Sequence, residues 1–303
     1  MPDTSLSPDE LRRIEALAVD LARQAGAVLL EKSQQAIAAE FKSKDQSDPV
    51  TAADRELEQF LHQAIKQAYP HHAIVGEEGA NYSPSEAPDV VWVLDPLDGT
   101  ANFAGGLPLF AVSIGVLHRY KPVAGAMFVS VSHRNRPGVY HAHAGGGAFF
   151  EDEPLSLPQS VGAGRVNLSG SIWWRPYRAW ARKAKDYQLQ MRSLGCMVLE
   201  MALVAAGVLT CAVFSRPRAW DVAAGVLLVQ EASGVVLTHA PGRGDWHSMS
   251  EFEVSKEQRD KPVEALRAWC SPLLIGHRDI VLPMASAFTE RRLGFLPRLW
   301  PFR

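Results

Sequence analysis

An apolar stretch at residues 90–94 leads directly into two aspartates, Asp95 and Asp98, which a glycine and a threonine follow. The stretch lacks polar alternation, which is typical of a strand buried on both faces. Pro96 cannot donate to a sheet ladder, so we expect the strand to stop there. Both carboxylates would then lie at the carboxyl end of a strand, where open α/β sheets bind their ligands.

The residue types in this string predict metal-assisted phosphate chemistry. Clustered carboxylates suit a hard cation such as Mg²⁺, which prefers oxygen ligands. Gly99 lets backbone N–H groups approach an anion closely, and Thr100 adds a hydroxyl beside them. A simple turn after a core strand would also use Asp, Pro and Gly, but the whole string at the end of a buried strand favours a ligand site. No G-x-x-x-x-G-K-[ST] string occurs, which excludes a P-loop.

Composition limits the size and the partners of the protein. The chain has 303 residues, 47% of them hydrophobic, enough for one large domain or two lobes. Its net charge of -2 gives no reason to expect nucleic-acid or anionic-membrane binding. The longest apolar run, residues 197–214, is interrupted by polar residues, so we expect a core helix and no membrane span. Three sparse cysteines and an N-terminus without a signal-type apolar core predict a cytoplasmic protein.

Hydrophobic periodicity and turn signals predict an alternation of helices and strands. A stretch rich in Pro, Gly, Ser and Gln at residues 152–164 separates a first lobe, about 1–150, from a second, about 160–290. The helices are expected at 8–32, from 51 to Pro70, and at 175–185, 195–208, 220–234, 261–269 and 278–289. The strands are expected at 73–75, 90–94, 110–117, 123–131, 138–142, 165–169, 189–193, 209–214, 235–238 and 272–275.

Four separated strings together resemble the inositol monophosphatase family of Mg²⁺-dependent, lithium-sensitive phosphatases. They are D-P-V-T-A-A-D at 48–54, G-E-E at 76–78, D-P-L-D-G-T at 95–100 and W-D-V-A-A-G at 220–225. The resemblance covers roughly residues 8–290. It implies an α/β fold, the alternating α/β/α/β/α sandwich of the inositol monophosphatase and fructose-1,6-bisphosphatase type, usually assembled as a homodimer. It also implies a single catalytic domain over residues 1–303, whose two lobes share one active site.

The resemblance also implies a set of two or three Mg²⁺ ions and their ligands. Glu77, Asp95 and the backbone carbonyl of Leu97 would bind the first ion. Asp95 would bridge to a second ion that Asp98 and Asp221 also bind, and a third, weaker Mg²⁺ would lie near Glu77. Two divalent ions about 3.5–4 Å apart can clamp the attacking and leaving oxygens of an in-line displacement. Taken alone, Asp221 would be interpreted as a helix N-cap and Glu77 as part of a solvated turn; the four strings together favour ligation.

Water is the expected nucleophile. By similarity Thr100 would hydrogen-bond that water, and Asp48 would accept a hydrogen bond from Thr100; Glu77 completes the expected catalytic set. Threonine alone is a poor base at neutral pH, so metal coordination must supply most of the activation. Backbone N–H groups at Gly99 and Thr100 would hold phosphate oxygens. Asp54 is expected to cap the second helix, with a supporting role beside the site as the alternative.

The second lobe departs from the family pattern. Gly195 and Cys196 stand where many members have glycine followed by serine or threonine. Both are candidates for the substrate site, although a small core residue is the favoured interpretation of Cys196. Phe214 stands where inositol-binding members carry a glutamate, and Arg216 and Arg218 follow it. Losing an acid and gaining two cations favours a substrate with a second anionic group; the alternative is that both arginines are solvated loop charges.

Two further segments receive no assigned function. Aromatic and basic residues alternate at 173–180, a pattern that can stack nucleotide bases but that a core or a dimer interface explains better. The basic, aromatic tail at 291–303 extends beyond the family pattern.

The sequence therefore predicts Mg²⁺-dependent hydrolysis of a small phosphomonoester, an inositol phosphate or a related sugar or alcohol phosphate, by metal-activated water. Three related activities stay open: 3′(2′),5′-bisphosphate nucleotidase, fructose-1,6-bisphosphatase and histidinol-phosphatase. A regulatory role through RNA or protein partners on the same fold is the non-enzymatic alternative, and the complete set of metal ligands argues against it. A phosphodiesterase would need an open groove, and the near-neutral charge does not favour a long polyanion.

Overall fold

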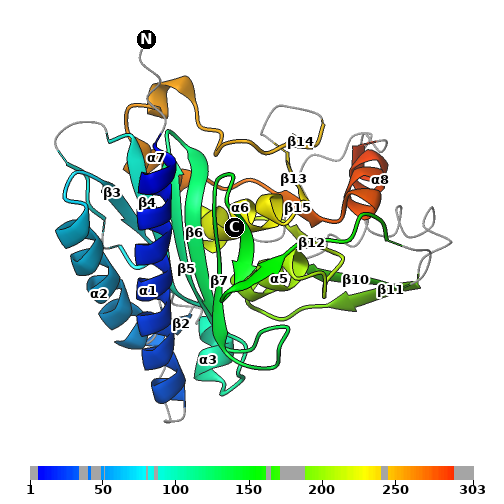
Figure 1. Cartoon of the computed structure of the whole chain (residues 1–303), viewed down its shortest axis with the longest axis horizontal. Helices are drawn as coiled ribbons and strands as arrows, with labels where there is room; N and C mark the ends of the chain where they lie inside the picture. Colours follow the sequence, from blue (N-terminus) through cyan, green and yellow to red (C-terminus); the bar gives the residue numbers. More distant parts are fainter. Residues whose placement is uncertain are drawn as a thin grey trace.

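The computed structural model describes residues 6–33, 40–41, 49–50, 52–79, 81–84, 88–161, 165–170, 188–239 and 245–289. The helices of this part are α1 (Pro8–Ser33), α2 (Ala52–Ala68), α3 (Thr100–Ala104), α5 (Met197–Ala205), α6 (Ala219–Glu231), α7 (Pro262–Ala268) and α8 (Arg278–Thr289), with a 3₁₀ turn at Lys256–Gln258. Figure 1 shows their places along the chain. Among the helices described, none is long and apolar enough to cross a membrane.

The strands form two large sheets and one short ribbon. The first sheet has the order β3-β4-β5-β6-β7-β8-β9 and is antiparallel except for the β3–β4 pair. Its strands are β3 (Ala73–Gly76), β4 (Val90–Asp98), β5 (Ala111–His118), β6 (Lys121–Val129), β7 (Gly138–His143), β8 (Gly147–Phe150) and β9 (Glu153–Leu155). The second sheet has the order β11-β10-β12-β15-β13-β14. Its strands are β10 (Arg165–Gly170), β11 (Gln188–Arg192), β12 (Cys211–Phe214), β13 (Val235–Thr238), β14 (His247–Ser248) and β15 (Leu273–Gly276); the ribbon pairs β1 (Glu40–Phe41) with β2 (Pro49–Val50).

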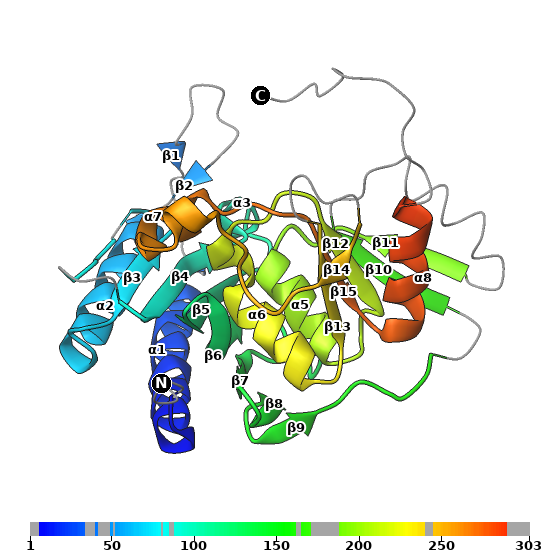
Figure 2. The same cartoon turned by 90° about the horizontal axis from the view of Figure 1, so that it is seen from above.

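The elements stack in five alternating layers, which confirms the predicted sandwich (Figure 2). Helices α1 and α2 cover one face of the first sheet. Helices α5 and α6 lie between the two sheets and contact both, and α8 packs on the outer face of the second sheet. Three clusters of buried apolar side chains fill the spaces between the layers, and the largest surrounds α5 and α6 and reaches both sheets.

Strand β4 is buried on both faces, as its continuous apolar sequence predicts. Val91 and Val93 belong to the cluster around α5 and α6, whereas Trp92 and Leu94 belong to the cluster beneath α1 and α2. Successive side chains of a strand point to opposite faces, so a strand between two helical layers must be apolar at every position.

The predicted end of this strand at Pro96 is wrong. β4 continues to Asp98, with Asp95 opposite Ser113 and Asp98 opposite Ala111, and the register shifts between these two pairs. Pro96 therefore lies in a β-bulge, where a residue without an N–H is tolerated because the ladder is already interrupted. The bulge still leaves both aspartates at the carboxyl end of the strand.

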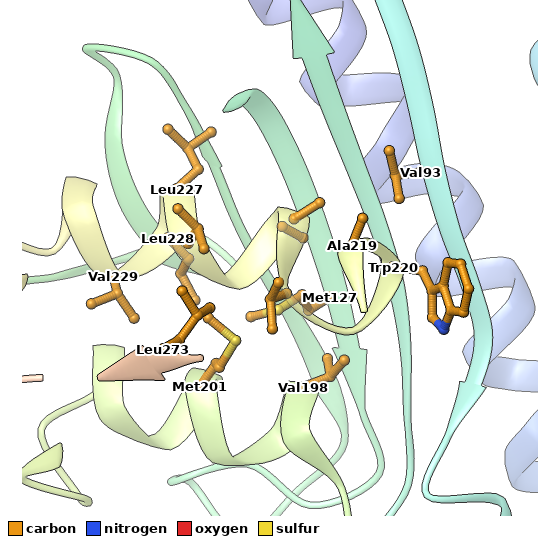
Figure 3. Close-up of a cluster of buried hydrophobic side chains, with 14 of the residues drawn as sticks. Val93, Met127, Val198, Met201, Ala219, Trp220, Leu227, Leu228, Val229 and Leu273 are labelled. Carbon is orange, nitrogen blue, oxygen red and sulfur yellow. The ribbon is translucent and has the colours of Figure 1, made fainter. Parts of the chain in front are cut away.

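Small residues let α6 lie directly on the first sheet and on α5. A Cβ at Gly115 of β5 would come 2.5 Å from the Cβ of Ala223, and one at Gly125 of β6 would come 2.9 Å from the Cα of Ala224. On the other side, Gly225 lies against Met201 of α5, which Figure 3 shows among the buried side chains between the two helices. The A-A-G part of the W-D-V-A-A-G string is therefore a packing surface.

Most expected elements are present within a few residues of their predicted bounds. The expected helix at 195–208 and strand at 209–214 are shorter, because a turn separates α5 from β12 and Gly207 in it has a φ of 73°. The expected helix at 175–185, the cluster at 173–180 and the tail at 291–303 lie outside the described residues.

Candidate active site

The structure brings four predicted acidic residues to the carboxyl end of β4. Asp95 is 1% exposed, and its pKa is raised well above the usual value, first by burial and then by the charges of Glu77, Asp98 and Asp221. These acids come from the loop after β3, from β4 itself and from α6. The tertiary structure thus assembles one acid cluster from three separate strings of the sequence.

The 95–100 turn closes on itself through local hydrogen bonds. The backbone N–H of Leu97 donates to Asp95 Oδ1 at 3.0 Å, and the Thr100 hydroxyl donates to the Leu97 carbonyl oxygen at 2.9 Å. Gly99 has a φ of 87°, and a Cβ there would lie 2.7 Å from the Leu109 carbonyl oxygen, so only glycine fits. The turn therefore presents its carboxylate, carbonyl and hydroxyl oxygens in a fixed arrangement.

Asp98 is held by the second half of the chain. Its Oδ2 accepts a hydrogen bond of 2.6 Å from the backbone N–H of Val198 at the start of α5. Burial raises the pKa of Asp98 to about 6, although the hydrogen bonds from Cys196 and Val198 act in the opposite direction.

Asp221 lies in the first turn of α6. Its Oδ2 accepts a hydrogen bond of 2.6 Å from the backbone N–H of Arg218, so the carboxylate also satisfies an N–H at the start of the helix. Burial and then the charge of Asp98 raise the pKa of Asp221 well above its usual value. The N-cap interpretation of Asp221 is therefore wrong, since Arg218 is the N-cap, but the Asp221 carboxylate still caps the helix from inside its first turn.

The loop that carries Glu77 is attached to the neighbouring strand and to α2. The backbone N–H of Glu77 donates to the Leu94 carbonyl oxygen at 3.1 Å, and that of Glu78 donates to Glu58 Oε1 at 2.8 Å. A Cβ at Gly76 would lie 1.9 Å from Glu58 Oε1, so a larger residue there would displace the Glu58 carboxylate. The Glu77 backbone is thus fixed from two sides.

Sequence reasoning underestimated the acids of α2. Asp54 and Glu58 are only 2% and 3% exposed, and Asp54 contributes to the raised pKa of Asp95. Both lie on the face of α2 that also buries Leu57 and Leu61. The sequence did contain a signal for this role, since Asp54 and Glu58 lie four residues apart on the apolar face of a predicted helix. Carboxylates on such a face become buried and need partners.

The acid cluster fits a divalent cation. Burial and mutual repulsion raise the pKa values of Asp95, Asp98 and Asp221, which is the pattern expected where bound positive charge would relieve the repulsion. In the described part of the chain, no three His, Cys, Asp or Glu side chains already converge in a complete metal site.

A pocket of about 320 Å³ opens beside Asp98 and brings three candidate substrate residues together, Gly195, Cys196 and Arg216. Ser193, Met197, Glu200, Phe214 and Ser215 complete the described lining. The Asn102 side chain fixes the pocket loop by donating to the carbonyl oxygens of Leu109 and Leu194, both at 2.8 Å. A larger pocket, about 480 Å³, lies beneath α1 and contains none of the predicted site residues.

The remaining candidate site residues, Cys196, Arg218 and Asp48, differ in where they lie relative to the pocket. Burial raises the pKa of the Cys196 thiol well above its usual range, so this side chain is a small core residue that touches the pocket and is unsuited to nucleophilic attack. The exposed Arg218 places its guanidinium 5.8 Å from the Trp220 ring centroid and is not among the described residues that line the pocket. Asp48 lies outside the described residues.

A five-layer sandwich with buried acids beside a small pocket defines the class of metal-dependent phosphatases. The model of the inositol monophosphatase family matches residues 10–268, and the chain belongs to this family. It is a phosphoric monoester hydrolase that depends on Mg²⁺.

Comparison with individual proteins gives the same family. The chain is 32% identical to inositol-1-monophosphatase of Bacillus subtilis over 74% of its length and 86% of that protein. It is 35% identical to Nus factor SuhB of Pseudomonas aeruginosa, over 73% of this chain and 83% of that one. It is 34% identical to the chloroplastic phosphatase IMPL1 of Arabidopsis thaliana over 77% of its length, but spans only 63% of that longer protein. The solved structure of the suhB protein from Bartonella henselae superimposes with a TM-score of 0.72 at 24% identity, covering 93% of this chain and all of that one, which shows the fold.

Proposed function

We propose that a small phosphorylated alcohol binds in the pocket beside Asp98, with its phosphate toward the acid cluster. The observation that carries this proposal is the acid cluster of Glu77, Asp95, Asp98 and Asp221, in which Asp95 and Asp221 are buried and Asp98 lines a 320 Å³ pocket. Pockets of this size suit small ligands. Anionic acids next to a phosphate would repel it unless cations lie between them.

Two or three Mg²⁺ ions are proposed for the cluster. Glu77, Asp95 and the Leu97 carbonyl oxygen would hold one, and Asp95, Asp98 and Asp221 a second, with a third near Glu77. The Leu97 carbonyl already accepts from Thr100 and keeps a second lone pair for a ligand. When bound, the ions supply the positive charge that acidifies water and neutralises charge on the transferring phosphoryl group.

The protein's own residues orient the attacking water and the phosphate. Because the Thr100 hydroxyl donates its proton to the Leu97 carbonyl, its lone pairs can accept a hydrogen bond from water. Asp48 would accept from Thr100, as the resemblance implies, only with the single hydroxyl proton turned away from the Leu97 carbonyl oxygen that accepts it in this structure. Backbone N–H groups of Gly99 and Thr100 are the proposed phosphate contacts. Gly195 and Cys196 would shape the substrate side of the pocket.

An inositol phosphate or a related sugar or alcohol phosphate is the proposed substrate. Phe214 supplies no acceptor for a hydroxyl group, whereas the exposed Arg216 on the pocket lining can bind a second anionic group. Arg218 would contribute its charge from beside Trp220. This arrangement, with arginine charges near the pocket and no acid at position 214, keeps bisphosphate nucleotidase, fructose-1,6-bisphosphatase and histidinol-phosphatase activities among the candidates.

A regulatory role is the second candidate function. The similarity to a protein named Nus factor SuhB supports the possibility of an RNA or protein partner. Retention of the complete acid cluster favours the enzymatic role, because a purely regulatory protein has no need for four acids that raise one another's pKa values.

Three further properties are proposed. Residues 1–303 form a single catalytic domain, since Asp98 of the first lobe and Val198 of the second are bonded at the site. The protein is a homodimer, as the resemblance implies, which light scattering after gel filtration would test. It acts in the cytoplasm, a reducing compartment that suits its three free cysteines; fluorescence microscopy of a tagged chain would test this.

The experiment is phosphate release from a panel of mono- and bisphosphorylated small molecules, with and without Mg²⁺. Asp95→Asn is the control, because it keeps the shape and removes the charge. Mg²⁺-dependent release that the variant lacks is the expected result, and the preferred panel member names the substrate group. Folded protein that is silent on every compound would instead support the regulatory role.

A further inference from the structure

Arg267 of α7 reaches the loop that carries Glu77. Its Nη1 donates to the Gly76 carbonyl oxygen at 2.7 Å and to Asn81 Oδ1 at 3.3 Å. Arg267 comes 191 residues after Gly76 and belongs to none of the four family strings. It is half-buried, and α7 itself packs against β3.

The same guanidinium also contacts the residue that precedes Asp221. Its Cζ lies 5.8 Å from the ring centroid of Trp220, within the range of a cation–π interaction. Trp220 is 8% exposed and packs in the central apolar cluster with Val93 of β4 (Figure 3). One side chain therefore bridges the two segments that carry Glu77 and Asp221.

Asn81 completes the connection. Its Oδ1 accepts from the backbone N–H of Gly76 at 3.2 Å, and its Nδ2 donates to the Gly79 carbonyl oxygen at 3.1 Å. The residues on both sides of Glu77 are thus tied to one amide side chain, which Arg267 contacts in turn. A planar guanidinium can donate in its plane and stack with its face at the same time, which an ammonium group cannot do.

We propose that Arg267 is a positioning residue that preorganises Glu77 and Asp221 for Mg²⁺ binding. This inference rests on the proposed function of the acid cluster. The direction of the effect of Arg267 on Mg²⁺ affinity can be tested, because a positive charge near a cation site, acting through Coulomb repulsion alone, weakens cation binding. If positioning dominates, removing Arg267 weakens Mg²⁺ binding; if charge dominates, removing it strengthens Mg²⁺ binding.

The test is calorimetric titration of Mg²⁺ alone into metal-free protein, for wild type, Arg267→Lys and Arg267→Leu. Positioning predicts that both variants bind Mg²⁺ about 10-fold more weakly, the usual scale for residues that orient metal ligands. Phosphatase assays should show a matching rise in the Mg²⁺ concentration for half-maximal rate, with kcat at saturating Mg²⁺ within about threefold of wild type.

Arg259→Lys is the matched control. Arg259 also lies 5.8 Å from an aromatic ring centroid, that of Tyr120, and also bonds to an acceptor, Glu251. Tyr120 follows His118, which pairs with Val90 at the end of β4 opposite to Asp98. The Mg²⁺ affinity of Arg259→Lys should equal that of wild type. Thermal unfolding in metal-free buffer verifies that each variant is folded, and Asn81→Ser, which loosens the same loop, replaces any Arg267 variant that does not fold.

Unchanged or tighter Mg²⁺ binding in the folded Arg267 variants would overturn the proposal, and so would wild-type binding in Arg267→Lys with a change only in Arg267→Leu. The proposed function fails separately, when wild-type protein binds no Mg²⁺ or releases no phosphate from any substrate.

Discussion

The backbone N–H of Val198 and the Asp98 carboxylate, 100 residues apart in the chain, form a hydrogen bond of 2.6 Å. Asp98 belongs to the first sheet, and Val198 lies in the first turn of α5, which packs between the sheets. The position of this carboxylate therefore depends on both halves of the protein. Folding of the first sheet alone would leave the acid cluster incomplete.

This bond predicts different outcomes for two substitutions of Asp98. Asp98→Asn keeps an oxygen that can accept from Val198, whereas Asp98→Ala leaves a buried N–H without a partner. We expect Asp98→Ala to be less stable than Asp98→Asn by about 1–3 kcal/mol. Both should lose Mg²⁺-dependent activity. Denaturant unfolding in metal-free buffer measures the difference, and equal stability of the two variants would argue against a structural role for the bond.

The raised pKa values of the acid cluster predict that Mg²⁺ stabilises the protein more at high pH. Asp98 has an ordinary pKa of 3.8 and a pKa of about 6 in the metal-free fold. Its contribution to stability is present below pH 3.8 and is lost as the pH rises through about 6, because the buried carboxylates then become charged together. The increase in Tm on adding Mg²⁺ should therefore be larger at pH 7.5 than at pH 5. The same increase at both pH values would contradict this account.

The contact between α6 and the first sheet predicts that Gly115→Ala disturbs both stability and metal binding. The added Cβ would lie 2.5 Å from the Cβ of Ala223 and 2.9 Å from the backbone nitrogen of Ala224, neither of which can rotate away. We expect a loss of about 1–3 kcal/mol in the free energy of unfolding, as for other overpacked cores. Since α6 carries Asp221, Mg²⁺ affinity measured by calorimetry should fall as well.

Gly106→Ala is the control for that substitution. A Cβ at Gly106 meets no atom within 4 Å, but the residue has a φ of 75°. It should show only the cost of a left-handed backbone, about 1 kcal/mol, with unchanged Mg²⁺ affinity. If Mg²⁺ affinity is unchanged in Gly115→Ala too, the position of α6 does not limit metal binding.

Glu15 predicts a pH-dependent stability away from the active site. It accepts hydrogen bonds from His141 at 2.7 Å and His143 at 2.5 Å, which ties α1 to β7. The other ring nitrogen of His141 faces the Glu151 carbonyl oxygen, 2.9 Å away, so both of its nitrogens donate and the ring is charged. Burial acts to lower the pKa of His141, but these hydrogen bonds outweigh burial, so the pKa of His141 is raised. Burial acts to raise the pKa of Glu15, but the hydrogen bonds from the two histidines outweigh it, so the pKa of Glu15 is lowered.

The directions of the two pKa shifts, of His141 and Glu15, define the pH range in which this contact stabilises the fold. The contribution of His141 is fully present below its unfolded pKa of 6.5 and is lost as the pH rises through its folded pKa. That of Glu15 is present above 4.5 and is lost as the pH falls. Glu15→Gln should therefore destabilise the protein most near pH 5.5, by about 1–3 kcal/mol, and less at pH 8.5. Denaturant unfolding at both pH values checks this, and a cost that does not change with pH would refute it.

The sequence alone predicted the elements whose pattern is local. Residues 90–94 of β4 are apolar at every position because this part of the strand lies between two helical layers, and the pattern is visible in the sequence. The acidic residues of the four strings were identified through the family resemblance, because their local patterns alone would make Asp221 a helix cap and Glu77 part of a solvated turn. Asp54 was noticed but given a capping role, because the sequence around it contains no information on which distant residues pack against it.

Only the tertiary structure decided how these segments meet. The bulge at Pro96 depends on the pairing of β4 with β5, and the burial of Glu58 depends on the Glu77 loop that covers it. Arg267 became part of the site through a contact across 191 residues. Periodicity and turn chemistry are local properties of a chain and can be recognised in the sequence. Contacts between distant segments form only when the layers pack, because the shape and burial of the folded protein determine which side chains meet.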